Sequence, residues 1–133
     1  MMRNGLVLPL IALILMLTAC GGNEVKLQLD NPRPGTVLDT RQIQISGKVS
    51  NLRETYFFYQ IEDGHSFIGE GKLTVDREGR FDLVAEVKTP SNANATISFY
   101  LDEDHNGEFD VETDTEQKIG SVDLVFDESL VQR

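Results

Sequence analysis

The sequence predicts an all-β protein, an antiparallel sandwich of seven strands. Apolar and polar residues alternate in seven short segments, and turn-forming residues separate these segments. After Cys20, no segment shows the apolar period of a helix. Short strands at this spacing are typical of a β-sandwich. The predicted strands comprise residues 25–29, 43–49, 56–61, 68–75, 81–87, 97–101 and 119–126.

The first two strands follow from alternation. Val25, Leu27 and Leu29 alternate with polar residues, as in a strand with one buried face. The run Asn-Pro-Arg-Pro-Gly at 31–35 interrupts the pattern. A second alternating run occupies residues 43–49, and Gly47 within it indicates a bulge.

Turn signals bound the next three strands. Residues 56–61 are rich in aromatic side chains, and the Glu-Asp-Gly at 62–64 ends that run. Residues 68–75 and 81–87 flank the Asp-Arg-Glu-Gly at 76–79, which is typical of a tight reverse turn. These segments therefore predict three strands separated by turns.

The last two strands flank an acidic segment. Residues 90–94 form a loop before the strand at 97–101, and the final strand occupies 119–126. The layout resembles that of bacterial immunoglobulin-like domains over residues 24–127, although it has no cysteine pair and no tryptophan. A transthyretin-like sandwich and a small barrel would show much the same pattern.

The first twenty residues have the layout of an export signal. Arg3 provides a positive start, and residues 6–17 form an apolar run. Twelve helical residues cover roughly 18 Å, which is less than a hydrocarbon core of ~30 Å, so a spanning helix is not expected. The Leu-Thr-Ala-Cys at 17–20 resembles a bacterial lipobox.

This resemblance implies a lipoprotein in which Cys20 is acylated, as by palmitate, and becomes the mature N-terminus. Residues 1–19 would be the signal peptide, 20–23 a short tether, 24–127 the sandwich and 128–133 a tail. Gly21 follows the cysteine, which favours the outer membrane in a Gram-negative source and the outer face of the single membrane in a Gram-positive one. The protein would face the periplasm or the exterior. An ordinary secretory signal with an incidental cysteine is the alternative.

The negative net charge of the chain limits the kinds of partner that it can bind. Removal of residues 1–19, which contain Arg3 and no acidic residue, changes the net charge from −10 to −11. Such a charge argues against nucleic acid as a partner. The remaining 114 residues are enough for one domain with a single core. The expected partners are the membrane, through the lipid anchor, and an envelope protein or glycan.

The acidic segment resembles the start of an EF-hand calcium loop. Asp102, Asp104 and Asn106 stand at positions 1, 3 and 5, and Gly107 at position 6 permits the sharp turn. Phe109 at position 8 is expected to anchor the loop to the core. The candidate calcium ligands are Asp102, Asp104, Asn106, Glu108 through its carbonyl, Asp110, Glu112 and Asp114.

The end of the loop departs from the EF-hand pattern. Position 12, normally a bidentate Glu, is Thr113, so Glu112, Asp114 or Glu116 must serve instead. Residues 102–116 contain eight carboxylates and no Lys or Arg, so their repulsion favours a bound cation. A solvated acidic loop is the alternative, and a transition metal with His105 is a remote third.

No catalytic group stands out, and the protein is not expected to be an enzyme. The sequence predicts a membrane-anchored, non-catalytic binding or structural module with a calcium-stabilised loop. Tyr56 and Phe58 alternate with the core-facing aromatic residues of their strand and are expected to form an exposed patch for a partner. An accessory substrate- or carbohydrate-binding subunit and a small envelope hydrolase are the alternatives.

Overall fold

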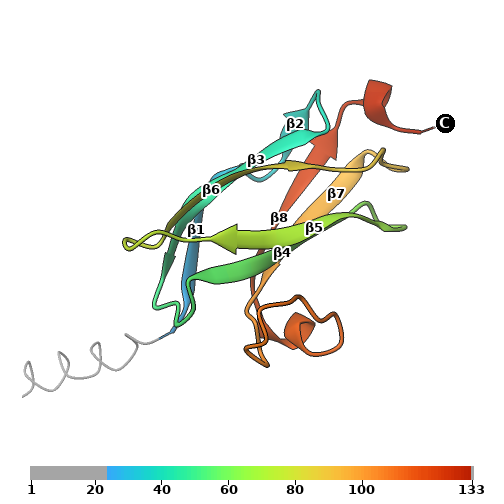
Figure 1. Ribbon diagram of the computed structural model, residues 1–133. Helices are drawn as coiled ribbons and strands as arrows, with labels where there is room; N and C mark the ends of the chain where they lie inside the picture. The colour runs from blue at the N-terminus through green and yellow to red at the C-terminus, as the bar shows by residue number, and fades with distance from the viewer. Residues whose placement is uncertain (1–23, 133) are drawn as a thin grey trace, which may run out of the picture.

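The computed structural model describes residues 24–132, which form two facing β-sheets (Figure 1). One sheet has three strands, in the order β1 (Lys26–Asn31), β3 (Gln42–Ser50) and β6 (Arg80–Glu86). The other has five, in the order β2 (Thr36–Leu38), β8 (Lys118–Phe126), β7 (Asn94–Tyr100), β4 (Tyr56–Glu62) and β5 (Phe67–Thr74). The prediction of an all-β, sandwich-like protein is confirmed.

All seven predicted segments are strands, with boundaries shifted by a few residues. The predicted signal peptide, the lipidation site Cys20 and the tether as far as residue 23 lie outside the described residues.

The core lies between the two sheets and is built from the alternating apolar residues. On β3, Ile43 and Ile45 are fully buried, and Gln44 between them is exposed. Phe57 on β4 meets Phe81 on β6 edge to face, with ring centroids 5.1 Å apart. Such aromatic contacts across the interior bury large apolar areas and hold the sheets together.

One strand, β2, was not predicted from the sequence. It pairs in parallel with β8, with Thr36 opposite Leu124. The amide of Gly35 donates to the carbonyl of Asp123 at 2.8 Å. The chain thus passes from β1 in the three-stranded sheet to β2 in the five-stranded sheet. With three residues, of which Val37 is 66% exposed, β2 is too short to show an alternating pattern.

The irregularity near Gly47 lies on the partner strand. The register of β1 shifts between Leu29 and Asn31, which pair with Gly47 and Ser46. A Cβ atom on Gly47 would lie 2.2 Å from the carbonyl oxygen of Gln28. The position therefore requires glycine because the two backbones approach closely there.

β4 is buried on both faces. Phe57 faces the core, while Phe58 and Gln60 on the opposite face are only 1% and 5% exposed. Phe109, in the acidic loop (residues 101–117, between β7 and β8), packs on Phe58 with ring centroids 5.3 Å apart. The exposed patch expected at Tyr56 and Phe58 is therefore not formed, because the acidic loop covers Phe58 and Tyr56 is half-buried.

Asp63 ties the loop after β4 to the loop before β7. Its side chain is fully buried, and its Oδ1 accepts hydrogen bonds from the amides of His65 and Ser66 at 3.0 and 2.9 Å. Its Oδ2 accepts from the amide and hydroxyl of Ser91 at 2.8 and 2.9 Å. Burial acts to raise the pKa of Asp63, but these four hydrogen bonds outweigh burial and lower the pKa.

We expect Asp63→Asn to reduce the free energy of unfolding at pH 7 by about 3 kcal/mol, because an amide group would then face backbone donors. Since the folded-state pKa lies below the ordinary value, the ionised side chain stabilises the fold above about pH 4 and loses this effect as pH falls. Urea unfolding at pH 7 and pH 3 should show a smaller difference at pH 3. Asp39→Asn, at an exposed carboxylate, is the control; equal unfolding free energies for Asp63→Asn and wild type at pH 7 would refute the role.

Candidate metal centre

The acidic loop folds back from the end of β7 over the outer face of the five-stranded sheet (Figure 1). The amide of Leu101 donates to the carbonyl of Gln117 at 3.0 Å and closes the base of the loop. A single 3-10 turn, Asp114–Gln117, leads into β8. Gly107 has φ +82°, a left-handed conformation that glycine adopts without steric penalty. This conformation allows the sharp turn predicted at position 6.

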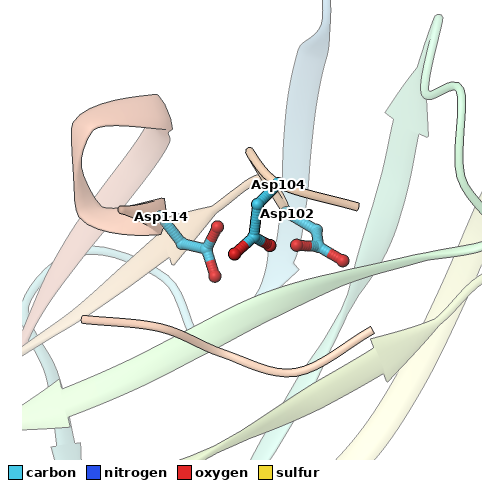
Figure 2. A group of neighbouring side chains, drawn as sticks. All are labelled: Asp102, Asp104 and Asp114. Atoms are coloured by element: carbon cyan, nitrogen blue, oxygen red, sulfur yellow. The ribbon is translucent and has the colours of Figure 1, made fainter. Parts of the chain in front are cut away.

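Three carboxylates converge in this loop. Asp102, Asp104 and Asp114 each present an oxygen, and these oxygens lie within 4.8 Å of one another (Figure 2). Asp102 and Asp114 are buried, at 3% and 0% exposure, whereas Asp104 is exposed. The arrangement therefore offers carboxylate oxygens, the type of ligand that a hard divalent cation prefers.

Backbone amides hold the two buried carboxylates in place. Asp102 Oδ2 accepts from the amide of Gly107 at 2.7 Å. Asp114 accepts from the amides of Glu103 and Asp110, each at 2.7 Å. The chain therefore curls around these side chains, and their orientation is set by the loop backbone.

Tyr56 links the centre to the sheet. Its hydroxyl donates to Asp102 Oδ2 at 2.5 Å. This hydrogen bond raises the pKa of Tyr56 to about 12, so the hydroxyl stays protonated and remains a donor. The sequence did not reveal this role, because Tyr56 is 46 residues from Asp102 and no local pattern joins them.

The other oxygen of Asp102 decides what the cluster can do. Asp102 Oδ1 is buried and has no hydrogen-bond partner. A buried anionic oxygen without a partner is strongly unfavourable, and a bound cation removes that penalty. Its environment therefore fits a metal ligand.

The pKa shifts of Asp102 and Asp104 agree with this geometry. Burial acts to raise the pKa of Asp102, but the hydrogen bonds from Tyr56 and Gly107 outweigh it and hold the pKa below its ordinary value. Desolvation and the neighbouring Asp102 carboxylate raise the pKa of Asp104.

Other predicted ligands make hydrogen bonds within the loop. Asn106 Oδ1 accepts from the amide of Glu108 at 2.9 Å, and Asp110 Oδ1 accepts from the amide of Glu112 at 3.0 Å. These contacts turn the loop backbone. Of the predicted acidic ligands, Asp102, Asp104 and Asp114 form the cluster, and the side chains of Glu108, Asp110 and Glu112 lie outside it.

The donor set indicates which metals fit. His105 Nδ1 lies 2.6 Å from a carboxylate oxygen of Glu54, so this ring pairs with Glu54 and does not join the cluster. The converging side chains offer only oxygen. Oxygen ligands suit calcium or magnesium, whereas zinc and copper sites usually include nitrogen or sulfur. The cluster of three aspartates can hold a metal ion such as calcium.

A Ser–His–Asp grouping occurs at the loops that Asp63 joins. Ser91 Oγ donates to Asp63 at 2.9 Å, and His65 Nδ1 lies 3.4 Å from the same Oγ. In a hydrolase triad the carboxylate orients the histidine, and the histidine takes the proton from serine. Here the carboxylate binds the serine, so the order of contacts differs from that of a triad.

Comparisons with known proteins identify no family. No family model matches the chain, and no curated protein matches it. A similar solved structure is a crystal structure of an engineered protein from the Northeast Structural Genomics Consortium, with a TM-score of 0.56 and 9% sequence identity. The match covers 80% of this chain and 21% of the engineered protein, so the chain spans about a fifth of its length. This likeness concerns the two-sheet fold alone.

Within residues 24–132, no helix has both the length and the apolar character needed to cross a bilayer.

Asp104 provides the sharpest test of the cluster. We expect Asp104→Ala to abolish any rise in melting temperature on calcium addition, because a ligand is lost. In chelator, the same variant should melt no lower than wild type, since removal of one carboxylate relieves the repulsion within the cluster. Differential scanning calorimetry with and without calcium checks both expectations.

Glu103→Ala is the matched control, because Glu103 is an adjacent exposed acid that lies outside the cluster. This variant should keep the calcium response of wild type. Equal calcium responses in the Asp104 and Glu103 variants would contradict the assignment.

Proposed function

We propose that this chain is a non-catalytic, lipid-anchored module of the bacterial cell envelope whose acidic loop is stabilised by calcium. The observation that carries the calcium part is the buried, unpartnered Oδ1 of Asp102 beside Asp104 and Asp114. The role of the module is binding or structural support at the envelope. The partner is an envelope protein or a glycan.

Calcium fits the site better than other cations. It takes six to eight oxygen ligands in flexible geometry, whereas magnesium requires a near-ideal octahedron. The three aspartates supply side-chain oxygens, and Asn106 with the carbonyl of Glu108 stands where an EF-hand loop provides two more. The expected dissociation constant is roughly 10⁻⁴ to 10⁻³ M, as in extracellular modules.

An immunoglobulin-like topology is the finer description of the fold that we propose. In constant-type domains, strands A, B and E share one sheet, and strands G, F and C share the other. The orders β1-β3-β6 and β8-β7-β4 match this arrangement when β6 is lettered E, in which case strand D has no counterpart in residues 24–132. In this scheme β5 is an added strand beside β4, and β2 is a short segment beside β8.

The lipid anchor would fix the orientation of the domain. Residues 21–24, between Cys20 and the sandwich, reach about 13 Å at most. Val25 lines a groove of about 290 Å³ together with Asp102, Glu103 and His105. The start of the domain and the metal centre therefore share one end of the sandwich, and we infer that this end faces the membrane.

The alternative is an accessory substrate- or carbohydrate-binding subunit that contacts its ligand through the acidic loop or the aromatic strand. The strand offers less for this role than the sequence predicted, because Phe58 lies under Phe109. We therefore place the proposed envelope role ahead of it.

Calcium should stabilise the protein measurably. At ten times its dissociation constant, calcium adds about 1.4 kcal/mol to the free energy of unfolding. For a domain of this size, that raises the melting temperature by about 5 °C. Chelator should lower the melting temperature, and added calcium should restore it, with magnesium at equal concentration giving a smaller rise. A melting temperature that stays constant throughout this titration would remove calcium from the proposal.

The anchor is tested at Cys20. We expect Cys20→Ser to move the protein from the membrane fraction to the soluble fraction, because acyl chains supply the membrane affinity. Intact mass spectrometry of the wild-type protein should find an acylated chain beginning at Cys20. Gly21→Ser is the control and should leave both results unchanged. An unmodified wild-type cysteine would exclude the lipid anchor.

A further inference from the structure

We propose that the acidic loop is a calcium-dependent lid, which covers an aromatic face of the five-stranded sheet and uncovers it when the ion leaves. The proposal rests on the calcium site proposed above and adds a conformational role to it. The covered face consists of Phe58 and Tyr100, which lie opposite each other on the adjacent strands β4 and β7, with the half-buried Tyr56 at its edge. The covering residue is Phe109.

Phe109 makes the contacts expected of a lid. Its ring centroid lies 5.3 Å from that of Phe58 and 5.5 Å from that of Tyr100, with the latter pair stacked at 24°. Phe58 is 1% exposed and Tyr100 is 7% exposed. Outer faces of antiparallel sheets are commonly solvated, so burial on this face requires a cover.

The lid and the metal centre are one continuous unit. Asp102 begins the arc, its Oδ2 accepts from the amide of Gly107, and Phe109 follows two residues later. Tyr56 joins the same carboxylate through its hydroxyl, and its ring lies 5.7 Å from that of Phe58. Displacement of Asp102 therefore affects both the loop turn and the aromatic face.

Outside the centre, the contacts that hold the loop closed are the packing of Phe109 and the pairing of His105 with Glu54 at 2.6 Å. Glu103, Asn106 and Glu108 are exposed, and the convergence of three carboxylates opposes closure unless a cation is present. The base of the loop is held separately, since Leu101 pairs with Gln117 through the backbone. Opening can therefore be confined to the segment that carries Phe109.

A static anchor is the competing explanation. In that case Phe109 keeps the loop on the sheet whether or not calcium is bound, and calcium adds stability without changing exposure. The two explanations differ in the effect of calcium on loop opening and on access to Tyr100.

The experiment uses the full chain in detergent and measures calcium binding by isothermal titration calorimetry. Amide hydrogen exchange and acrylamide quenching of tyrosine fluorescence are then compared in chelator and in calcium at ten times the dissociation constant. The sequence has three tyrosines and no tryptophan, so tyrosine emission is observed directly. At that calcium concentration, exchange at the amides of Gly107 and Asp110 should slow about tenfold, since calcium binds only the closed loop. Quenching should fall on calcium addition.

Phe109→Ala should raise quenching in calcium to the level of wild type in chelator. Phe67→Ala is the control, because Phe67 is 51% exposed on β5 and should leave quenching unchanged. If the alanine variant does not fold, Phe109→Leu is used, and the comparison in wild type decides the question by itself.

The outcomes separate the two proposals. Calcium binding by calorimetry without a change in exchange or quenching overturns the lid and leaves the calcium site intact. Absence of calcium binding overturns both. Calcium binding with slower exchange and lower quenching supports the lid.

Discussion

The position of Asp102 is the constraint on which the cluster of three aspartates and the acidic loop depend. One of its oxygens accepts hydrogen bonds from Tyr56 in the sheet and from Gly107 in the loop, and the other oxygen is buried without a partner. Oδ2 thus holds the loop on the sheet. Oδ1 is unfavourable in its buried position unless a cation or a proton pairs with it. The same side chain therefore anchors the loop to the sheet and presents a buried oxygen that a cation can neutralise.

Strand β4, which carries Tyr56, is itself covered on both faces. A three-stranded sheet covers the inner face, where Phe57 meets Phe81. The acidic loop covers part of the outer face through Phe109, and the Nζ of Lys72 lies 4.5 Å from the centre of the Tyr56 ring. A chain rich in acidic residues thus keeps its aromatic strand away from water by folding its most acidic segment over it.

Local patterns predicted the strands and the start of the loop, because alternation and ligand spacing are properties of consecutive residues. The parallel strand β2 escaped prediction, since its place depends on β8 and its three residues show no period. The cover over Phe58 and the hydrogen bond from Tyr56 to Asp102 join segments distant in sequence. Alternation cannot distinguish an outward ring in solvent from one beneath a loop. For the same reason, only the fold selects Asp114 from the acids near position 12.

Asp114 also explains why the affinity should be modest. An EF-hand loop closes with a glutamate that gives both oxygens to the ion. Here an aspartate one residue later takes that place, and each of its oxygens already accepts a backbone amide at 2.7 Å. A carboxylate oxygen has two acceptor positions, so Asp114 retains only one per oxygen for an ion. With fewer free acceptor positions, the loop should bind calcium only where the ion is abundant, as outside the cell. Weak binding also lets the occupancy of the site follow the calcium concentration.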